Sequence, residues 1–169
     1  MSRHAFEAHD HQDCIADAVA AAERLCAERK LQFTQVRQRV LEILLSEHKA
    51  MGAYEILDHL RAEGLGSQPP VAYRALDFLT KHGLAHRIER LNAFIACTHL
   101  QNAHAPAFLI CRSCERVVEA ESDPVGGELG RAAAQAGFVI ERTVREAEGL
   151  CPACAGAAPH AAGDRTASA

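Results

Sequence analysis

The stretch from His86 to Glu119 is rich in side chains that bind metal ions, because it contains three histidines, three cysteines and three glutamates. Two of these cysteines, Cys111 and Cys114, form a CxxC pair, and Cys151 and Cys154 form a second pair further along the chain. One pair of thiolates cannot fill the tetrahedral coordination of zinc, but two pairs can. The spacing therefore predicts a structural zinc site made by these four cysteines.

The second pair has an alternative interpretation, because Cys-Pro-Ala-Cys also resembles thioredoxin-type redox sites. In such sites the pair lies at the start of a helix that follows a strand. Here the pair lies beside residues 156–169, whose small and polar composition predicts a disordered tail. Zinc binding is therefore favoured over redox chemistry.

His86 and Cys97 indicate a second metal site. They lie in two short runs of alternating apolar residues, separated by a turn at Leu91 and Asn92, and such runs predict a β-hairpin. Pairing about that turn places residues opposite each other when their numbers sum to about 183, so His86 is expected to face Cys97. Cross-strand neighbours have Cβ atoms about 5 Å apart, which is close enough to share one zinc ion.

His104 and Glu119 are predicted to complete this second site. His104 lies in the linker after the hairpin and Glu119 in the next domain, so the ion would join both parts of the chain. His99 and Glu121 lie on the faces of Cys97 and Glu119, and they are alternatives to the two predicted ligands. A mixed set of donors that includes one thiolate suits zinc better than iron or manganese. The sequence thus predicts two zinc ions per monomer.

Four helices are predicted ahead of the hairpin, because apolar residues recur at three- and four-residue intervals. Their expected ranges are 13–29, 35–46, 53–63 and 69–81. Thr34 is a suitable N-cap, Pro69 fits a first helical turn, and Gly83 suits a helix C-terminus. Short helices followed by a hairpin are typical of a winged helix-turn-helix domain, which is predicted over residues 13–98.

Tyr73 and Arg74 lie on the polar face of the fourth predicted helix, and Tyr54 lies at the start of the third. Arginine can form paired hydrogen bonds with guanine or phosphate, and a tyrosine hydroxyl can donate to phosphate. A solvated face is the plain alternative, but the adjoining hairpin favours DNA contact. Arg37 and Arg39 are expected either to face the DNA backbone or to be solvated.

Residues 99–106 are predicted to be a polar hinge, and residues 107–155 a small second domain. Strands are expected on both sides of the first CxxC pair, followed by a helix over 124–136 and a long strand over 138–148. A domain of about fifty residues is marginal for an independent core, so bound metal and burial against a partner would both stabilise it. The whole chain is therefore predicted to have an α+β fold in two domains.

The composition restricts the class of protein further. With 18 basic and 22 acidic residues, the net charge of -4 does not by itself indicate nucleic-acid binding. Locally, residues 24–49 contain six basic and three acidic side chains, which is consistent with an amino-terminal half that faces DNA. The chain has no signal-peptide pattern and no apolar run long enough to span a membrane. This predicts a reducing cytoplasm, where CxxC pairs indicate metal or redox chemistry rather than disulfides. Residues 1–12 are predicted to be a disordered, histidine-containing tail.

Five runs of the chain are similar to the ferric uptake regulator superfamily: LQFTQVRQRVLEIL, AYEIL, PPVAYRALDFL, FLICRSC and GLCPAC. The resemblance extends over residues 14–155. The PPVAYRALDFL run and the placement of His86 and Cys97 look most like the zinc uptake regulator branch. A single histidine, His104, stands where the iron branch has several, which argues against iron.

The resemblance implies a homodimeric, zinc-dependent transcriptional repressor of zinc uptake genes. The four-cysteine zinc would build a carboxyl-terminal dimerisation domain, and a second, regulatory zinc would orient the DNA-binding domains on a palindromic, AT-rich operator. Contacts to phosphates and bases would be made by Tyr54 and Arg74. The regulatory ligands would be His86, Cys97, His104 and Glu119.

Two other classes of protein fit the sequence less well. A zinc deaminase requires His-x-Glu together with Pro-Cys-x-x-Cys, but His86 is followed by Arg-Ile-Glu, and Pro152 lies inside its CxxC pair. A metal-buffering or peroxide-sensing relative is the other alternative. Peroxide sensing requires iron or manganese held by histidine and carboxylate, and Cys97 among the ligands argues against it.

Overall fold

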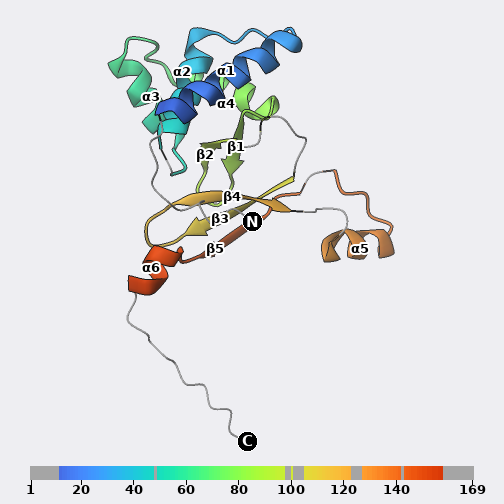
Figure 1. Cartoon of the computed structure of the whole chain (residues 1–169). Helices are drawn as coiled ribbons and strands as arrows, with labels where there is room; N and C mark the ends of the chain where they lie inside the picture. The colour runs from blue at the N-terminus through green and yellow to red at the C-terminus, as the bar shows by residue number, and fades with distance from the viewer. Residues whose placement is uncertain are drawn as a thin grey trace, which may run out of the picture.

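The computed structural model describes residues 12–47, 49–97, 100, 105–122, 127–141 and 143–157. The elements follow one another in the order α1 (Gln12–Glu28), α2 (Gln35–Ser46), α3 (Ala53–Ala62), α4 (Pro69–Lys81), β1 (Ala85–Ile88), β2 (Ala93–Ala96), β3 (Ala105–Cys111), β4 (Val117–Ser122), α5 (Glu128–Gln135), β5 (Glu146–Gly149) and α6 (Pro152–Ala157). Figure 1 shows α1 to α4 grouped at one end of the molecule, with the β1–β2 hairpin between them and the carboxyl-terminal sheet of β3, β4 and β5. The predicted α+β fold is confirmed.

The predicted tails and hinge lie largely outside the described residues. Of the tails 1–12 and 156–169, the structure describes Gln12, which begins α1, and the last two residues of α6. Within the hinge predicted over 99–106, β3 already begins at Ala105. In the part of the chain that is described, no helix has the length and apolar character needed to cross a membrane.

Helices α2 to α4 begin and end at residues that suit those positions. Thr34 precedes α2 in an extended conformation, and its Oγ1 accepts a hydrogen bond from the N–H of Arg37 at 3.5 Å. Pro69 occupies the first turn of α4. Gly64 and Gly83 follow α3 and α4 with φ angles of 72° and 73°, a left-handed conformation that favours glycine.

The four helices pack around one apolar core, and the hairpin contributes to it. Its fully buried side chains include Val40, Leu41, Ile56, Leu57, Leu60, Leu76, Leu79 and Leu84. The apolar stripe of α4 faces this core, so the opposite side of the helix, with Tyr73 and Arg74, is exposed. Core packing thus decides which face of α4 is available to a partner.

Arg37 and Arg39 make contacts within the helical domain. Arg39 donates hydrogen bonds to both carboxylate oxygens of Glu63, at 2.6 and 2.7 Å. It also donates to Glu42 at 2.9 Å. The guanidinium of Arg37 lies over the ring of Phe78, 3.7 Å from its centroid. These two arginines connect α2 to Glu63 at the end of α3 and to α4, so the expectation that they are merely solvated is wrong, and the alternative that they face the DNA backbone stays a prediction.

The hairpin has a different register from the predicted one. His86 pairs with Ile95, and not with Cys97. The cause is the turn, which comprises residues 89–92 and is closed by a hydrogen bond from the N–H of Asn92 to Glu89 O at 3.2 Å. Its centre lies one residue earlier than predicted, which shifts every pair by two. Cys97 is therefore a diagonal neighbour of His86 on the same face of the hairpin.

The carboxyl-terminal sheet has the strand order β4-β3-β5, in which β3 is antiparallel to β4 and parallel to β5. The strands predicted on both sides of the first CxxC pair are present as β3 and β4. The helix predicted over 124–136 is present as α5, which begins at Glu128 and ends before Gly137, a residue with a φ of 67°. The sheet places β5 directly beside β3, although β4 and α5 separate these two strands in the sequence.

The long strand predicted over 138–148 is wrong for most of its length. In its described part, only Glu146–Gly149 forms a strand. β5 pairs with β3 from Phe108 to Cys111, and Arg145, directly ahead of β5, accepts a hydrogen bond from the N–H of Phe108 at 2.8 Å. Phe138 and Val139 are instead 67% and 79% exposed. The alternating pattern in the sequence therefore marks apolar side chains that this chain does not bury.

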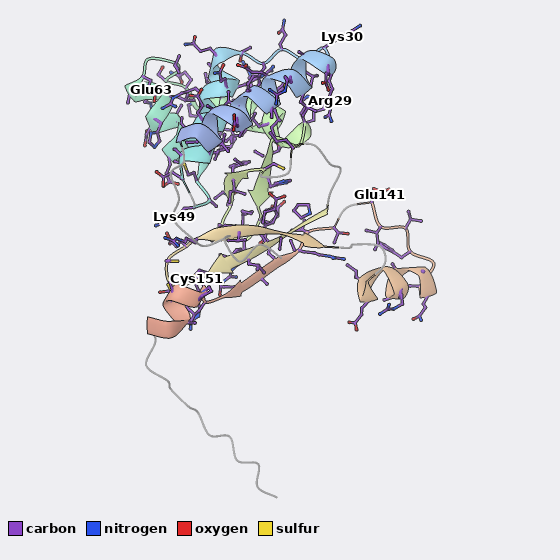
Figure 2. All side chains as sticks on the ribbon, viewed as in Figure 1. Arg29, Lys30, Lys49, Glu63, Glu141 and Cys151 are labelled. Carbon is purple, nitrogen blue, oxygen red and sulfur yellow. The ribbon has the colours of Figure 1, made fainter. Side chains whose placement is uncertain are left out.

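The hairpin packs against the carboxyl-terminal sheet through a second apolar cluster. Its buried members are Ile88, Ile95, Phe108, Ile110 and Val117. Figure 2 shows side chains occupying the space between the hairpin and the sheet. Lys49, in the loop between α2 and α3, forms an isolated β-bridge with Arg116, and its Nζ lies 3.8 Å from Glu115 Oε2. The helical domain with its hairpin thus contacts the carboxyl-terminal sheet through both apolar packing and polar contacts.

Candidate metal centres and DNA-facing surface

The four cysteines of the two CxxC pairs lie together at one end of the carboxyl-terminal sheet. Cys111 ends β3, and Cys114 lies in the turn that follows it. Cys151 directly precedes α6, and Cys154 lies within that helix. The four sulfur atoms all lie within 4.8 Å of one another, and those of Cys114 and Cys151 are 3.8 Å apart. Because β3 and β5 are parallel neighbours, both pairs reach the same end of the sheet.

Hydrogen bonds within this cluster change the acidity of its thiols. The N–H of Cys151 lies 3.3 Å from Cys111 Sγ. This bond, together with one from the N–H of Cys114, lowers the pKa of Cys111 to about 6. The Ser113 side chain lowers the pKa of Cys154, but the neighbouring cysteines raise it more strongly, to about 12. Four thiolates at this separation are stable together only beside a cation, and a zinc ion in tetrahedral coordination could supply that charge.

The second CxxC pair lies between a strand and a helix, because β5 ends at Gly149 and α6 begins at Pro152. The placement predicted from the sequence, beside a disordered tail and away from the start of a helix, is therefore wrong. The choice of zinc depends instead on geometry. A redox site needs two sulfurs, whereas here the sulfurs of both pairs converge. A closed set of four thiolates is typical of structural zinc.

A second group of possible metal ligands lies between the hairpin and the carboxyl-terminal sheet. It comprises His86 of β1, Cys97 directly after β2 and Glu119 of β4. One donor atom of each lies within 4.8 Å of the others. His86 Nε2 is 3.4 Å from Glu119 Oε1, and these side chains are 17% and 2% exposed. We call this group the hinge cluster, because its members come from both parts of the molecule.

Backbone pairing positions the members of the hinge cluster. The N–H of Cys97 donates to Leu84 O at 3.0 Å, which extends the hairpin ladder and keeps Cys97 on the face of His86. Glu119 is opposite Phe108 in the β3–β4 ladder. The ring of Phe108 in turn packs against the imidazole, with 5.4 Å between the ring centroids. Sequence reasoning did not single out Phe108, because an apolar residue in a strand looks like any other core residue.

The structure brings three of the four predicted regulatory ligands together. The fourth, His104, lies outside the described residues, as does its alternative His99. Glu121 follows Glu119 by two residues in β4, and its side chain is not among those described. One nitrogen, one sulfur and one oxygen donor in a largely buried site match the ligand chemistry of zinc, which takes a fourth donor in tetrahedral geometry.

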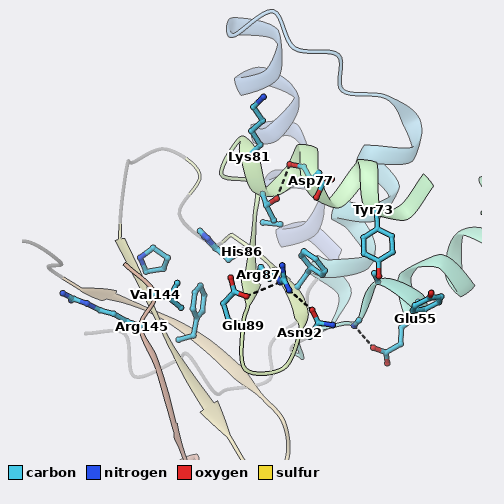
Figure 3. Close-up of a pocket in the computed structure, with 18 of the residues that line it drawn as sticks. Glu55, Tyr73, Asp77, Lys81, His86, Arg87, Glu89, Asn92, Val144 and Arg145 are labelled. Atoms are coloured by element: carbon cyan, nitrogen blue, oxygen red, sulfur yellow. Dashed lines mark hydrogen bonds and ion pairs between the residues drawn. The ribbon is translucent and has the colours of Figure 1, made fainter. Parts of the chain in front are cut away.

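The side chains predicted to contact DNA are exposed on α3 and α4. Tyr54, the second residue of α3, is 64% exposed, and Tyr73 of α4 is 43% exposed. Arg74 lies beside Tyr73 on the same exposed face. A cleft of about 900 Å³ runs from the two tyrosines to His86 and Arg145. In Figure 3, Tyr73 of α4 borders this cleft on one side, and Arg145, from the segment before β5, borders it on the other.

A winged helix, a sheet domain with four converging cysteines and a ligand cluster between them define a class of metal-binding, DNA-binding protein. The model of the ferric uptake regulator family matches residues 28–144. The chain belongs to this family.

Individual relatives narrow the comparison. The chain is 39% identical over 140 residues to the zinc uptake regulation protein of Escherichia coli (strain K12), an alignment that covers 82% of this chain and 81% of that protein. Its structure is similar to that of a zinc uptake regulator complexed with zinc and DNA, with a TM-score of 0.80 and 36% identity over 85% of this chain and 96% of that one. It is also similar to holo XcZur, with a TM-score of 0.75 and 40% identity over 83% and 98% of the two chains. The resemblance to the zinc uptake regulator branch is confirmed.

Proposed function

We propose that this chain is a zinc-responsive transcriptional repressor of zinc uptake genes, that it is not an enzyme, and that it works in the cytoplasm. The observation that carries the proposal is the hinge cluster, because its ligands come from both the hairpin and the carboxyl-terminal sheet. A ligand that binds one domain orientation better than others favours that orientation and the DNA binding that depends on it. The similarity to zinc uptake regulators, one of them complexed with zinc and DNA, supports this function.

Cys111, Cys114, Cys151 and Cys154 would hold a structural zinc ion. Their segments are already joined by backbone hydrogen bonds, since the N–H of Arg112 donates to Gly149 O at 2.9 Å. The thiolates would therefore hold the end of β3 and the start of α6 together without rearrangement of the sheet. For a domain with few buried apolar residues, this cross-link contributes directly to folding.

His86, Cys97 and Glu119, with His104 as the fourth ligand, would hold a regulatory zinc ion, which makes two per monomer. Bound there, zinc supplies a cross-link between the hairpin and the carboxyl-terminal sheet. The cluster is largely buried, because Phe108 packs against the imidazole and the side chains of His86 and Glu119 are only 17% and 2% exposed. The single thiolate gives the site its preference for zinc over manganese and iron.

Tyr54, Tyr73 and Arg74 would contact the operator. Arg74 can form paired hydrogen bonds with a guanine edge or a phosphate, and the tyrosine hydroxyls can donate to phosphates. In a homodimer the two copies of α4 would enter major-groove faces about 34 Å apart, so the expected operator is a palindrome. We propose an AT-rich sequence for it, as the resemblance to the family implies.

The homodimer interface is proposed to include α5 and the segment that follows it. The large exposed apolar residues there are Leu129, Phe138, Val139 and Val144. Figure 1 shows α5 set apart from the helical domain, beside the carboxyl-terminal sheet. Exposed apolar residues gathered in one region of a chain are typical of an interface. Burial against a second copy would also stabilise a small domain.

Zinc stoichiometry measured together with operator binding tests this function. The purified protein should contain two zinc ions per monomer, and mild chelation should remove one of them and abolish operator binding. Cys111→Ser should lose the retained zinc and the dimer together. Identical operator occupancy by fluorescence anisotropy with and without a strong chelator would contradict the proposal.

A further inference from the structure

The turn of the hairpin is bound to β5 by two glutamates that belong to neither metal cluster. The N–H groups of Glu89 and Arg90 donate to the two carboxylate oxygens of Glu146, at 2.6 and 3.0 Å. The Arg90 side chain donates from Nε to Glu148 Oε2 at 2.5 Å, and the Nη2 of the same ion pair also lies 2.5 Å from that oxygen. We call these three hydrogen bonds and the ion pair the hairpin–β5 contact.

The two hydrogen bonds to Glu146 determine where the hairpin turn lies on β5. They join both oxygens of one carboxylate to consecutive backbone N–H groups, and bonds to an ionised acceptor are stronger than those between neutral groups. The donors are backbone groups, so no side-chain rotamer has to be ordered on their side. The Arg90–Glu148 pair is 56% and 35% exposed and contributes less, because solvent screens it.

β5 is itself held firmly next to the four-cysteine site. It pairs with β3 from Phe108 opposite Glu146 to Cys111 opposite Gly149, and it leads directly to Cys151. Glu146 and Glu148 are two residues apart, so they extend from the same face of the strand. The strand that ends at the cysteines therefore also determines where the turn of the hairpin lies.

Building on the proposed function, we propose that Glu146 is a positioning residue that holds the hairpin on β5 and so contributes to the orientation in which α4 meets the operator. It acts in addition to the hinge cluster and holds no metal. In this role the hairpin turn connects the two domains, and its amide groups donate to Glu146 rather than to a DNA phosphate.

Amide exchange measured by NMR on the zinc-loaded protein without DNA tests the contact itself. Glu146→Ala removes both acceptors, so the amides of Glu89 and Arg90 should exchange at least about tenfold faster than in the wild type. Glu23→Ala removes an exposed carboxylate on α1 and should leave both rates unchanged. Equal rates in the wild type and Glu146→Ala would overturn the proposal.

Operator affinity at saturating zinc tests the positioning role. Glu146→Ala should bind about tenfold more weakly, with two zinc ions still bound, and Glu23→Ala should bind as the wild type does. Arg90→Glu and Glu148→Arg should each weaken binding, and the double variant should recover part of the loss. Unchanged affinity of Glu146→Ala would overturn the role. Failure of the wild type to bind the operator would refute the proposed function instead, and amide exchange would still decide whether the contact exists.

Discussion

At the scale of single residues, His86 connects the hairpin to the carboxyl-terminal sheet. It belongs to the hairpin, its Nε2 lies 3.4 Å from Glu119 of the sheet, and its ring packs on Phe108. Cys97 reaches the same point from the other hairpin strand. A change at this imidazole therefore acts on the link between the two domains while the helical core and the four cysteines remain intact.

His86→Ala removes the nitrogen donor of the hinge cluster. We expect the zinc content to fall from two ions to one per monomer and the zinc-dependent gain in operator affinity to be lost, by at least about tenfold. Fluorescence anisotropy as a function of free zinc measures the second effect. His59→Ala, which alters an exposed histidine of α3, is the matched control. A normal zinc response in His86→Ala would remove this residue from the site.

Arg74→Ala tests the exposed face of α4. The loss of one forked side chain should weaken operator binding by about 1–3 kcal/mol at constant zinc. Zinc content and dimerisation should not change, because Arg74 lies in neither metal cluster. Arg24→Ala on α1 removes the same charge from another exposed site and serves as the control. An identical mobility-shift titration for the wild type and Arg74→Ala would place DNA recognition elsewhere.

At the scale of the elements, the end of α4 determines how the chain continues into β1. The N–H of Gly83 donates to Thr80 O at 3.2 Å, and the N–H of Leu84 donates to Leu79 O at 2.8 Å. These bonds satisfy the last carbonyls of α4 and turn the chain directly into β1. The left-handed conformation of Gly83 thus connects the proposed recognition helix to the strand that carries His86.

Gly83→Ala should destabilise the protein by about 1 kcal/mol, because a Cβ is unfavourable at a φ of 73°. The added atom meets nothing within 4 Å, so backbone strain is the only expected cost. The urea midpoint of the zinc-loaded protein measures the change. Gly149→Ala also adds a Cβ in open space, at a position without a positive φ, and should be nearly neutral. Equal midpoints for the two variants would contradict this account of the helix end.

At the scale of the whole molecule, several kinds of contact relate the helical domain to the carboxyl-terminal sheet. They include the apolar cluster around Ile88 and Phe108, the ligands of the hinge cluster, the hairpin–β5 contact and the β-bridge of Lys49 with Arg116. In a dimer the same sheet domain would also relate one winged helix to the other. The relative orientation of the two winged helices would therefore depend both on contacts within each chain and on contacts between the chains.

Phe138→Asp tests the proposed dimer interface. Burial of an unpaired carboxylate costs several kcal/mol, so dimerisation should weaken by at least about a hundredfold. Analytical ultracentrifugation at micromolar concentration should then show a monomer. Leu91→Asp places the same charge on another exposed apolar residue, in the hairpin turn, and should leave the dimer intact. A stable Phe138→Asp dimer would place the interface elsewhere.

The sequence by itself determined the features that depend on neighbouring residues. The cap at Thr34, the helix end at Gly83 and the two CxxC pairs were predictable, because caps, left-handed turns and knuckles are each decided within a few residues. The hairpin was also predictable from its alternation. The types of donor, a histidine and a thiol on adjoining strands, already indicated which metal ion the molecule would bind.

Tertiary structure alone decided the features that depend on distant partners. One local feature also departed from the sequence pattern, because the turn of residues 89–92 set the hairpin register and made Cys97 a diagonal neighbour of His86. The strand predicted over 138–148 formed only in the part that pairs with β3. Glu146 reached the hairpin turn across more than fifty residues of chain. An alternating or polar pattern indicates which kind of strand or hydrogen-bond partner a residue can take, but only the folded chain decides which partner lies beside it.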